Sequence, residues 1–441
     1  MPFDSGYDEA RSVWNGMVDK RPAMIANCIN ADDIKKCVNF ARSHDLLVSI
    51  KGGGHNVAGR AVWDDALMIN LSQMNAVVVD PVKRTVRVES GATLGELDKE
   101  TQKFGLATPS GIVSKTGIAG LTLGGGNGYL SRKHGLTIDN LLSVELVTAE
   151  GDLIAANKTE NPDLFWALRG GGGNFGVVTS FEFKLHEIGP EIMTARVFYP
   201  IEDAKQVLQF YREFTSNAAD ELAAYALIIS VPPADPFPES HQGKTAIVLL
   251  VSYAGSLDDG KMALEPLEKF GNPFVQVIMP MSFVELQTSF DKSTPYGIRN
   301  YWKAHYMDHL SDEAIDVLVN YTHDIPGPLS VVGIEPFGGA ITRVEESATA
   351  FPQRSASYIL GLFSGWIESE DDEKNINWTR ELYHKMTAFA SGGVYSNYLD
   401  KDDSDKIRPS FGSNYSRLQK VKYKYDPNNF FKLNLNIIPK P

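Results

Sequence analysis

The chain has 441 residues, 43% hydrophobic and 22% charged, which is the balance of a soluble globular protein with more than one ordinary core. Asp and Glu number 55 against 42 Lys and Arg, and the net charge of −13 argues against nucleic acid or an anionic membrane as a partner. No apolar run approaches the roughly 20 residues that span a bilayer, the N-terminus lacks a signal-peptide pattern, and Cys28 and Cys37 form no C-x-x-C motif, so we predict a cytoplasmic protein.

Helix and strand patterns alternate through the first 185 residues, and glycines separate them. An amphipathic helix is predicted over 31–45, with Asp32 or Asp33 as its cap, and the strand of LLVSIKGG follows. A helix within 93–104 is expected to stop at Gly105. The other patterns predict strands within 67–80, 85–89 and 174–188, two strands joined at Glu150-Gly151 within 141–156, and a short helix within 161–170.

From about residue 188, longer strands alternate with amphipathic helices. Helices are predicted over 202–218 and 371–390, and strands within 192–200, 222–231, 245–255, 329–339 and 355–366. This alternation indicates a sheet that helices cover on one face. After a polar link, a helix is predicted over 414–426 before the tail PNNFFKLNLNIIP.

Three motif-like segments do not carry the chemistry they suggest. HQGKT lacks the first glycine of a phosphate-binding loop, because position 238 is proline. GGGNFG matches G-x-G-x-x-G, but a strand pattern follows it where a dinucleotide-binding fold needs a helix. We interpret His305 and His309, in YWKAHYMDHL, as one polar face of a helix, and no metal site is predicted.

Four glycine clusters lie at 52–54, 117–120, 124–128 and 170–173. Any one of them is explained by a tight turn. Four within about 120 residues suggest a single long anionic ligand held by backbone N–H groups, which glycine-rich loops present without obstruction by side chains.

The segments SIKGGGHN, LGGGNGYLSRKHGLTIDN, LRGGGGNFGVVT and YDPNNFF occur in that order. Together they resemble the flavin-linked oxidases of the berberine bridge enzyme family, within the vanillyl-alcohol oxidase superfamily, and most nearly its bacterial 6-hydroxy-D-nicotine oxidase-like branch. The resemblance covers nearly the whole chain and implies an α+β fold. A two-part FAD-binding domain of the vanillyl-alcohol oxidase type is expected over 1–190 and 396–441, and a substrate domain with an antiparallel sheet covered by helices over 191–395.

The resemblance implies FAD, bonded through its 8α-methyl group to His55. A neutral imidazole nitrogen is nucleophilic near pH 7, which suits such a bond. Many family members add a second bond from a cysteine, but Val113 stands at that position, so one link is expected. The other positions that the resemblance assigns to the cofactor are Lys51, Gly52, Gly53, Gly54, Asn56, Gly59, Gly117, Gly120, Gly124, Gly125, Gly126, Asn127, Gly128, Leu130, Asp139, Asn140, Gly171, Asn174, Gly176, Val177, Asn434 and Asn436. For the last two, a role as edge-strand asparagines is the alternative.

For catalysis, the resemblance points to Tyr398, in YSNYLD, as general base. Its phenol, with an ordinary pKa near 10, would need neighbouring cations or N–H donors to lower that pKa. Tyr395 is the second candidate, and packing roles for both are the alternative. The glutamine or glutamate that other members carry after an FPHR-like segment is replaced here by Leu360 and Leu362. Glu335 is a further carboxylate that either faces the substrate or is structural.

The resemblance therefore implies an FAD-dependent oxidase that transfers a hydride from a small alcohol, sugar or cyclic amine to flavin, and then reduces dioxygen to hydrogen peroxide. Two alternatives stay open: a dehydrogenase that uses another acceptor, and a flavin-binding protein without turnover. The aromatic side chains of the middle region are expected to pack in the core rather than line a pocket; they are Tyr225, Phe283, Tyr301, Trp302 and Trp366. Neither the substrate nor the oligomeric state is predicted.

Overall fold

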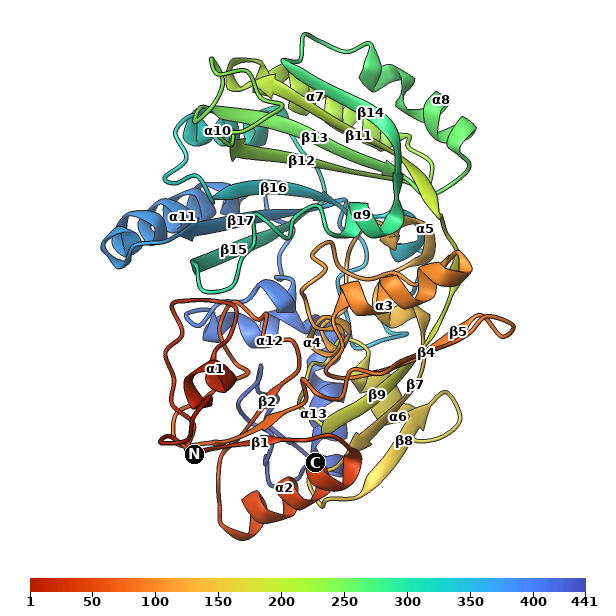
Figure 1. Ribbon diagram of the computed structural model, residues 1–441, viewed down its shortest axis with the longest axis vertical. Coiled ribbons are helices and arrows are strands. Elements are labelled where there is room, and N and C mark those ends of the chain that lie inside the picture. The colour runs from red at the N-terminus through yellow and green to blue at the C-terminus, as the bar shows by residue number, and fades with distance from the viewer.

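The computed structural model describes residues 1–441 and consists of two halves with different sheets (Figure 1). The lower half in that view holds both chain ends and three small sheets. The upper half is a seven-stranded sheet with helices on its outer face. None of the helices combines the length and apolar character that crossing a membrane requires.

A three-stranded parallel sheet follows the short helix α1 (Tyr7–Arg11). Its strand order is β1 (Met24–Asn27), β3 (Leu67–Asn70) and β2 (Val48–Lys51), and α2 (Ala31–Ser43) connects β1 to β2. The Asn30 side chain caps α2 by accepting from the Asp33 amide at 3.0 Å. The predicted cap at Asp32 or Asp33 is therefore wrong, because both carboxylates lie inside the first turn, where they favour the helix dipole instead.

The second sheet of the lower half has five antiparallel strands in the order β4-β5-β9-β7-β8. Helix α3 (Leu94–Thr101) packs against it, begins at a capping box between Thr93 and Glu96, and continues as a 3₁₀ turn to Gly105, whose φ of 64° ends it as predicted. The remaining elements of this half are β4 (Val77–Asp80), β5 (Thr85–Glu89), β6 (Leu106–Ala107), α4 (Ile118–Leu123), α5 (Ser131–His134), β7 (Leu141–Val147), β8 (Leu153–Asn157), α6 (Pro162–Leu168), β9 (Val177–Lys184) and β10 (His186–Glu187).

The upper sheet is antiparallel throughout, as the resemblance implies. Its strands in order are β14 (Val275–Ser282), β11 (Glu191–Pro200), β13 (Thr245–Tyr253), β12 (Leu222–Ser230), β16 (Val331–Pro336), β17 (Tyr358–Trp366) and β15 (Arg299–Met307). Strands β14 and β15 are missing from the sequence prediction. The helix interpreted around His305 and His309 is wrong, because Arg299–Met307 pairs with β17 along its whole length. His305 is buried within that strand, and its Nε2 lies 3.0 Å from the carbonyl oxygen of Tyr383.

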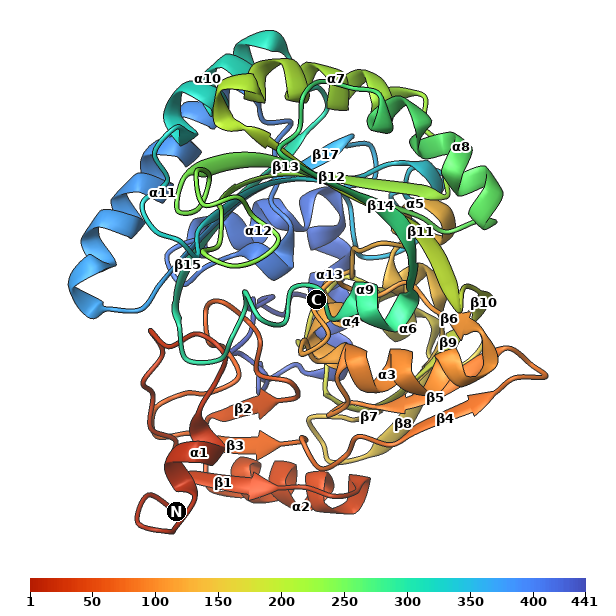
Figure 2. The ribbon, with the colours of Figure 1, turned by 45° about the horizontal axis from the view of Figure 1, so that its top comes forward.

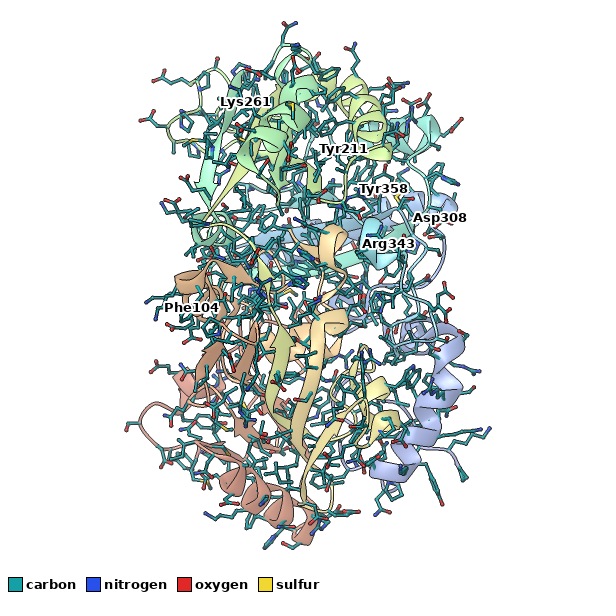
Figure 3. All side chains as sticks on the ribbon, turned by 90° about the vertical axis from the view of Figure 1, so that its right-hand side faces the viewer. Phe104, Tyr211, Lys261, Asp308, Arg343 and Tyr358 are labelled. Carbon is teal, nitrogen blue, oxygen red and sulfur yellow. The ribbon has the colours of Figure 1, made fainter.

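Four helices lie along the outer face of this curved sheet, while its inner face looks toward the lower half (Figure 2). They are α7 (Ala204–Ser216), α8 (Leu257–Glu268), α10 (Asp312–Thr322) and α11 (Asp372–Met386). Buried aromatic residues join helix to sheet, as at Tyr211 of α7 and Tyr358 of β17 (Figure 3). The Tyr211 hydroxyl donates to the carbonyl oxygen of Ala224 in β12 at 2.9 Å. Helix α9 (Phe283–Gln287) instead contacts α3 of the lower half.

The C-terminal tail returns to the lower half through α12 (Ile407–Ser410) and α13 (Tyr415–Tyr425), and α13 packs on α6. Leu418, Val421, Leu435 and Ile437 of the tail join the same hydrophobic core as strands β5, β7 and β9. The segment that ends the chain thus packs with strands from residues 85–184 of the lower half. The domain limits at 190 and 395 stay a prediction.

Candidate cofactor and active site

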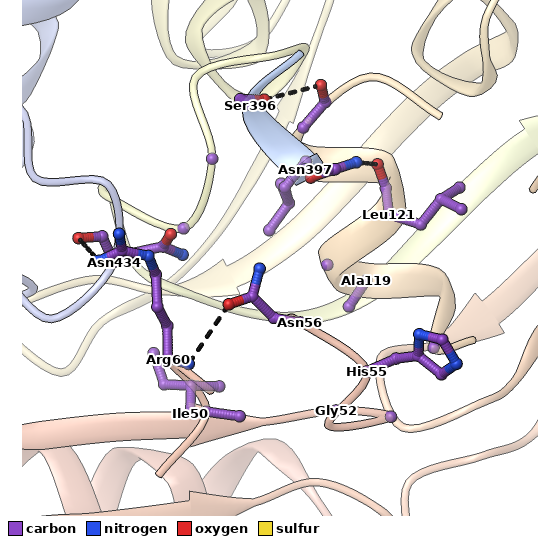
Figure 4. A pocket seen from close by; sticks show the side chains of 18 of the residues that line it. Ile50, Gly52, His55, Asn56, Arg60, Ala119, Leu121, Ser396, Asn397 and Asn434 are labelled. Atoms are coloured by element: carbon purple, nitrogen blue, oxygen red, sulfur yellow. Dashed lines mark hydrogen bonds between the residues drawn. The ribbon is translucent and has the colours of Figure 1, made fainter. Parts of the chain in front are cut away.

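A pocket lined by 37 residues lies in the lower half and reaches the upper sheet at Trp302 (Figure 4). They belong to the segments 48–71, 111–127, 172–178 and 395–435, with Trp302 added from β15. Each of the four glycine clusters contributes to this lining. The four clusters therefore meet at one pocket, which is consistent with the prediction that they surround a single ligand.

Glycine is required where the lining loops touch one another. A Cβ atom on Gly53 would lie 2.5 Å from the nitrogen of Gly117, and one on Gly117 would lie 2.4 Å from the nitrogen of Gly53. A Cβ on Gly124 would lie 2.0 Å from Oδ1 of Asn397. These positions have no room for a side chain, so part of the pocket wall is bare main chain.

His55 follows β2 at the pocket wall, where its ring stacks on Trp14 with centroids 4.4 Å apart and planes 15° apart. Its Nε2 is buried and has no hydrogen-bond partner. Burial lowers the pKa of His55 to about 4, so the ring is neutral at pH 7. A neutral imidazole held in one orientation is the kind of nucleophile that a covalent flavin bond needs.

The predicted cofactor positions divide between the pocket surface and the layer behind it. At the surface lie Gly52, Gly53, Gly54, His55, Asn56, Gly117, Gly120, Gly124, Asn127, Gly176, Val177 and Asn434. Outside the lining lie Lys51, Gly59, Gly125, Gly126, Gly128, Leu130, Asp139, Asn140, Gly171, Asn174 and Asn436.

Polar side chains in the second group have protein partners. The Lys51 ammonium donates to two carbonyl oxygens of the α1 segment, at 2.9 and 2.7 Å. Asp139 pairs with the buried Arg354 at 2.7 Å, and Asn140 donates to the carbonyl oxygens of His134 and Leu136. These contacts position the loops of the wall, so the structure gives these three side chains a supporting place rather than a direct ligand contact.

Asn174 fixes the C-terminal tail against the pocket. Its Nδ2 donates to the carbonyl oxygen of Leu435 at 2.9 Å, and its Oδ1 accepts from the amide of Ile437 at 3.2 Å. Asn434 consequently lines the pocket, whereas Asn436 lies behind it with a buried, unpartnered Oδ1. The alternative of edge-strand asparagines is wrong, because this part of the tail belongs to no strand.

Tyr398 lines the pocket and bonds to Glu335, a buried residue of β16 that lies outside the lining. The Tyr398 hydroxyl donates to Oε1 of Glu335 at 2.7 Å, and Asn127 Nδ2 donates to Oε2 at 3.2 Å. Burial raises the pKa of Glu335 to about 7, although these two hydrogen bonds oppose the shift. Burial, then the charge of Glu335, raise the pKa of Tyr398 well above 10. The expectation that cations or N–H donors lower the Tyr398 pKa is therefore wrong, because its partner is a carboxylate.

Tyr395 also lines the pocket, with its ring 4.9 Å from that of Tyr398. Its hydroxyl accepts from the Gly126 amide at 2.8 Å and from Asn397 Nδ2 at 3.0 Å. Burial nevertheless raises the pKa of Tyr395 to about 12, so the hydroxyl stays protonated near neutral pH. Of the three predicted catalytic residues, Glu335 has the pKa that suits a base, and the tyrosines suit proton donation and transfer.

Two lining residues were missed or misjudged in the sequence. Trp302 lines the pocket and packs edge-to-face against Tyr398, whereas core packing was expected for it. Arg60 lines the pocket at the end of the HNVAGR loop. A cation five residues after His55, in a loop already expected to hold a ligand, is a signal that could have identified it.

The site fits FAD by its own chemistry. Ten of its 37 lining residues are glycines, and its one lining histidine has a neutral ring with a free, buried nitrogen. The lining also includes a single guanidinium, which suits an anionic cofactor.

Comparison with known proteins agrees with this assignment. Residues 22–157 match a family model described as an FAD binding domain, and residues 394–438 match one described as berberine and berberine like. The chain is 35% identical over 429 residues to an FAD-linked oxidoreductase of Dictyostelium discoideum, covering 97% of this chain and 91% of the relative. It is 30% identical to (R)-6-hydroxynicotine oxidase of Paenarthrobacter nicotinovorans, covering 99% and 96%.

Solved structures give the same result. The fold matches 6-hydroxy-D-nicotine oxidase from Arthrobacter nicotinovorans with a TM-score of 0.87 and 28% identity, over 100% of this chain and 97% of that one. It matches a chitooligosaccharide oxidase with a TM-score of 0.86 and 25% identity, over 100% and 97%. The predicted family resemblance and the α+β fold are confirmed.

Proposed function

The chain belongs to the berberine-like family of FAD-linked oxidoreductases, and we propose that it is an oxidase with its flavin bonded to His55. The proposed substrate is a small organic molecule whose carbon gives up a hydride, and dioxygen is the proposed acceptor. The observation that carries the proposal is the hydrogen bond from Tyr398, which lines the same pocket as His55, to the buried carboxylate of Glu335 outside the lining. It supplies a buried proton acceptor next to a cofactor-sized site.

FAD, when bound, supplies the hydride acceptor and passes the electrons on. The main chain of the glycine clusters would hold it, with Asn56 and Asn434 beside it on the wall. The free Nε2 and low pKa of His55 support the covalent bond, since the ring is available and neutral without having to lose a proton. Val113 lines the pocket at the position where relatives carry a second linking cysteine. Cys28 and Cys37 lie together elsewhere, with their sulfur atoms 3.8 Å apart, which supports a single link.

Removal of a hydride from an alcohol carbon leaves an O–H proton to dispose of. In the proposed route, that proton moves to the Tyr398 hydroxyl oxygen while the Tyr398 proton moves to Oε1 of Glu335. The tyrosine therefore passes a proton without ever becoming a free phenolate, which its high pKa disfavours. Glu335 is the base, and its pKa of about 7 keeps a large fraction ionised near neutral pH.

The relatives act on different substrates according to their names, and this leaves alcohols, sugars and cyclic amines as the proposed classes. The pocket wall near Tyr398 is aromatic, with Trp302 and Tyr395 packed around it. A flat or cyclic substrate suits such a wall. A neutral amine has no O–H proton to lose, so its oxidation would depend little on Glu335.

Two measurements test the proposal. Substrates of the three classes are mixed anaerobically with purified protein, and bleaching of the oxidised flavin band identifies those that transfer a hydride. Admission of air then separates the acceptors: an oxidase recovers its yellow colour within one turnover and forms one hydrogen peroxide for each substrate. A flavin that bleaches but recovers only with an added dye would identify the dehydrogenase alternative, and no bleaching by any class would contradict the proposal.

A further inference from the structure

Arg60 is the only lysine, arginine, aspartate or glutamate among the 37 residues that line the pocket. Figure 4 shows its side chain extending from the loop after Asn56, near Ile50, toward Asn434. The loop itself is fixed, because Asn56 Oδ1 accepts from the Arg60 amide at 3.4 Å. A single positive charge is thus built into an otherwise uncharged wall.

The guanidinium of Arg60 has few partners within the protein. One Nη1 contact reaches the carbonyl oxygen of Asn434 at 3.4 Å, and the buried Nε has no hydrogen-bond partner. The acids Asp400 and Asp403 have other partners. Asp403 pairs with Lys303 and Lys406, each at 2.8 Å. The Asp400 carboxylate accepts from the backbone amides of Trp302 and Lys401. Neither acid forms a salt bridge with Arg60.

An arrangement of this kind is unfavourable in the protein alone. Burial lowers the pKa of Arg60, yet a guanidinium stays protonated at any ordinary pH. A half-buried charge without a counter-ion carries a desolvation penalty that a fixed anionic partner would offset. The guanidinium has further N–H donors for which the protein offers no acceptor.

We propose that Arg60 binds anionic oxygen of the FAD, and that it is the positioning cation of this cofactor site. Two parts of FAD have that chemistry: the diphosphate, and the pyrimidine edge of the flavin ring, which becomes anionic on reduction. The inference depends on FAD binding and not on the oxidase reaction. Wild-type flavin content, measured first, shows whether its premise holds independently of any turnover.

The experiment compares purified Arg60→Met, Arg60→Lys and wild-type holoenzyme in two measurements. Methionine keeps the apolar stem without the charge, and lysine restores a cation with poorer geometry. Flavin content per polypeptide reports the hold on FAD. The dissociation constant for sulfite, which adds to the oxidised ring and leaves negative charge at its pyrimidine edge, reports the cation beside that edge.

If Arg60 faces the pyrimidine edge, Arg60→Met keeps its flavin and binds sulfite at least about tenfold more weakly, as for loss of one charge-assisted hydrogen bond. A tenfold change in the two-electron equilibrium equals a fall of about 30 mV in flavin potential. If Arg60 faces the diphosphate, flavin content falls while the loaded fraction binds sulfite normally. In both cases Arg60→Lys lies between Arg60→Met and wild type.

Arg132→Gln is the matched control. Arg132 is also half-buried, also bonds only backbone carbonyl oxygens, and does not line the pocket. Wild-type flavin content and sulfite binding in Arg60→Met would overturn the proposal. So would Arg132→Gln changing either measurement as much as Arg60→Met does, or Arg60→Lys behaving no better than Arg60→Met.

Discussion

The Tyr398 hydroxyl lies 2.7 Å from Oε1 of Glu335 and donates to it, so a tyrosine from the C-terminal return and a glutamate from the upper sheet form one unit. Asn127, from the lower half, completes it at 3.2 Å. Hydrogen bonds thus join the two halves of the molecule at this contact. Each residue shifts the pKa of the other, while burial makes the larger contribution to both shifts.

We expect Glu335→Gln to slow flavin reduction by an alcohol substrate about 10²–10⁴-fold, because the amide cannot accept the proton. In wild type, the rate should rise with pH through an apparent pKa near 7, since ionised Glu335 is the active form. Stopped-flow reduction under anaerobic conditions, measured across pH, checks both. A rate within twofold of wild type, or an unchanged pH profile, would show that Glu335 is not the base.

Glu335→Gln should also change how stability depends on pH. Because the folded-state pKa of Glu335 is raised, its protonated form favours folding below the unfolded pKa of about 4.5, and this contribution is lost as pH rises to about 7. Glu335→Gln has no carboxyl group to ionise, so its stability does not fall in this way as pH rises. Its free energy of unfolding relative to wild type should therefore increase between pH 5 and 7.5, as measured by denaturant titration, and a constant difference would contradict the assigned pKa.

Tyr398→Phe keeps the ring and removes the hydroxyl. The hydrogen bond from Tyr398 lowers the pKa of Glu335, so its loss should shift the midpoint of the pH–rate profile to higher pH. We expect flavin reduction by an alcohol to slow by about 10²-fold or more, with about 1 kcal/mol lost in stability and flavin content unchanged. With an amine substrate the rate should barely change. An alcohol rate within twofold of wild type would remove Tyr398 from the proton route.

The sequence predicts this site in part. His55, the glycine clusters, Tyr398, Tyr395 and Glu335 were singled out by type and motif, whereas Arg60 was missed and Trp302 was expected to pack in the core. Their division of labour was not predictable, because it depends on which strand faces which loop. Glu335 has the raised pKa that the proposed base needs because β16 buries it, 2.7 Å from the Tyr398 hydroxyl, and no spacing in the sequence reports that contact.

The fold shows the same limit. Helix α3, which is followed by a 3₁₀ turn that ends at a glycine, and strand β5, whose side chains alternate in burial, follow local rules and were predicted. Strand β15 was not, because its tyrosine, tryptophan and histidine residues have no clear period, and only pairing with β17 defines it as a strand. Arg60 was missed although it follows His55 by five residues in a loop expected to hold a ligand, and only the structure shows that the other lining residues are uncharged.

His55 gives a prediction about attachment. Acid-precipitated wild-type protein should keep its yellow colour in the pellet, and His55→Ala should release flavin into the supernatant. Proteolysis should place the flavin on one peptide containing His55, because Val113 has no thiol to offer and Cys28 and Cys37 lie beside each other outside the pocket lining. Colour lost from the wild-type pellet would contradict the covalent bond, and a flavin bridging two peptides would contradict the single link.

The tail provides the last prediction, through a buried ion pair. Lys422 of α13 and Asp426 lie 2.6 Å apart with both side chains fully buried, and the ammonium also donates to the carbonyl oxygens of Asn174 and Phe431. The carboxylate in turn accepts from the amides of Phe430 and Phe431. One lysine thus joins the tail to the Gly171–Val177 loop of the pocket.

Lys422→Met should cost about 3–5 kcal/mol, because it leaves Asp426 charged and unpaired in the core. Flavin content should fall with it, since Asn174 and Asn434 lose their support. Truncation before Asn414 should abolish loading of FAD altogether.

Lys424→Met is the control. Lys424 is two residues away, exposed, and paired with Asp163 on the surface, where such a pair contributes at most about 1 kcal/mol. Denaturant unfolding and the ratio of flavin to protein absorbance measure both effects. A truncated protein that still binds FAD stoichiometrically, or equal losses for the two lysine variants, would show that the tail does not hold the cofactor site in place.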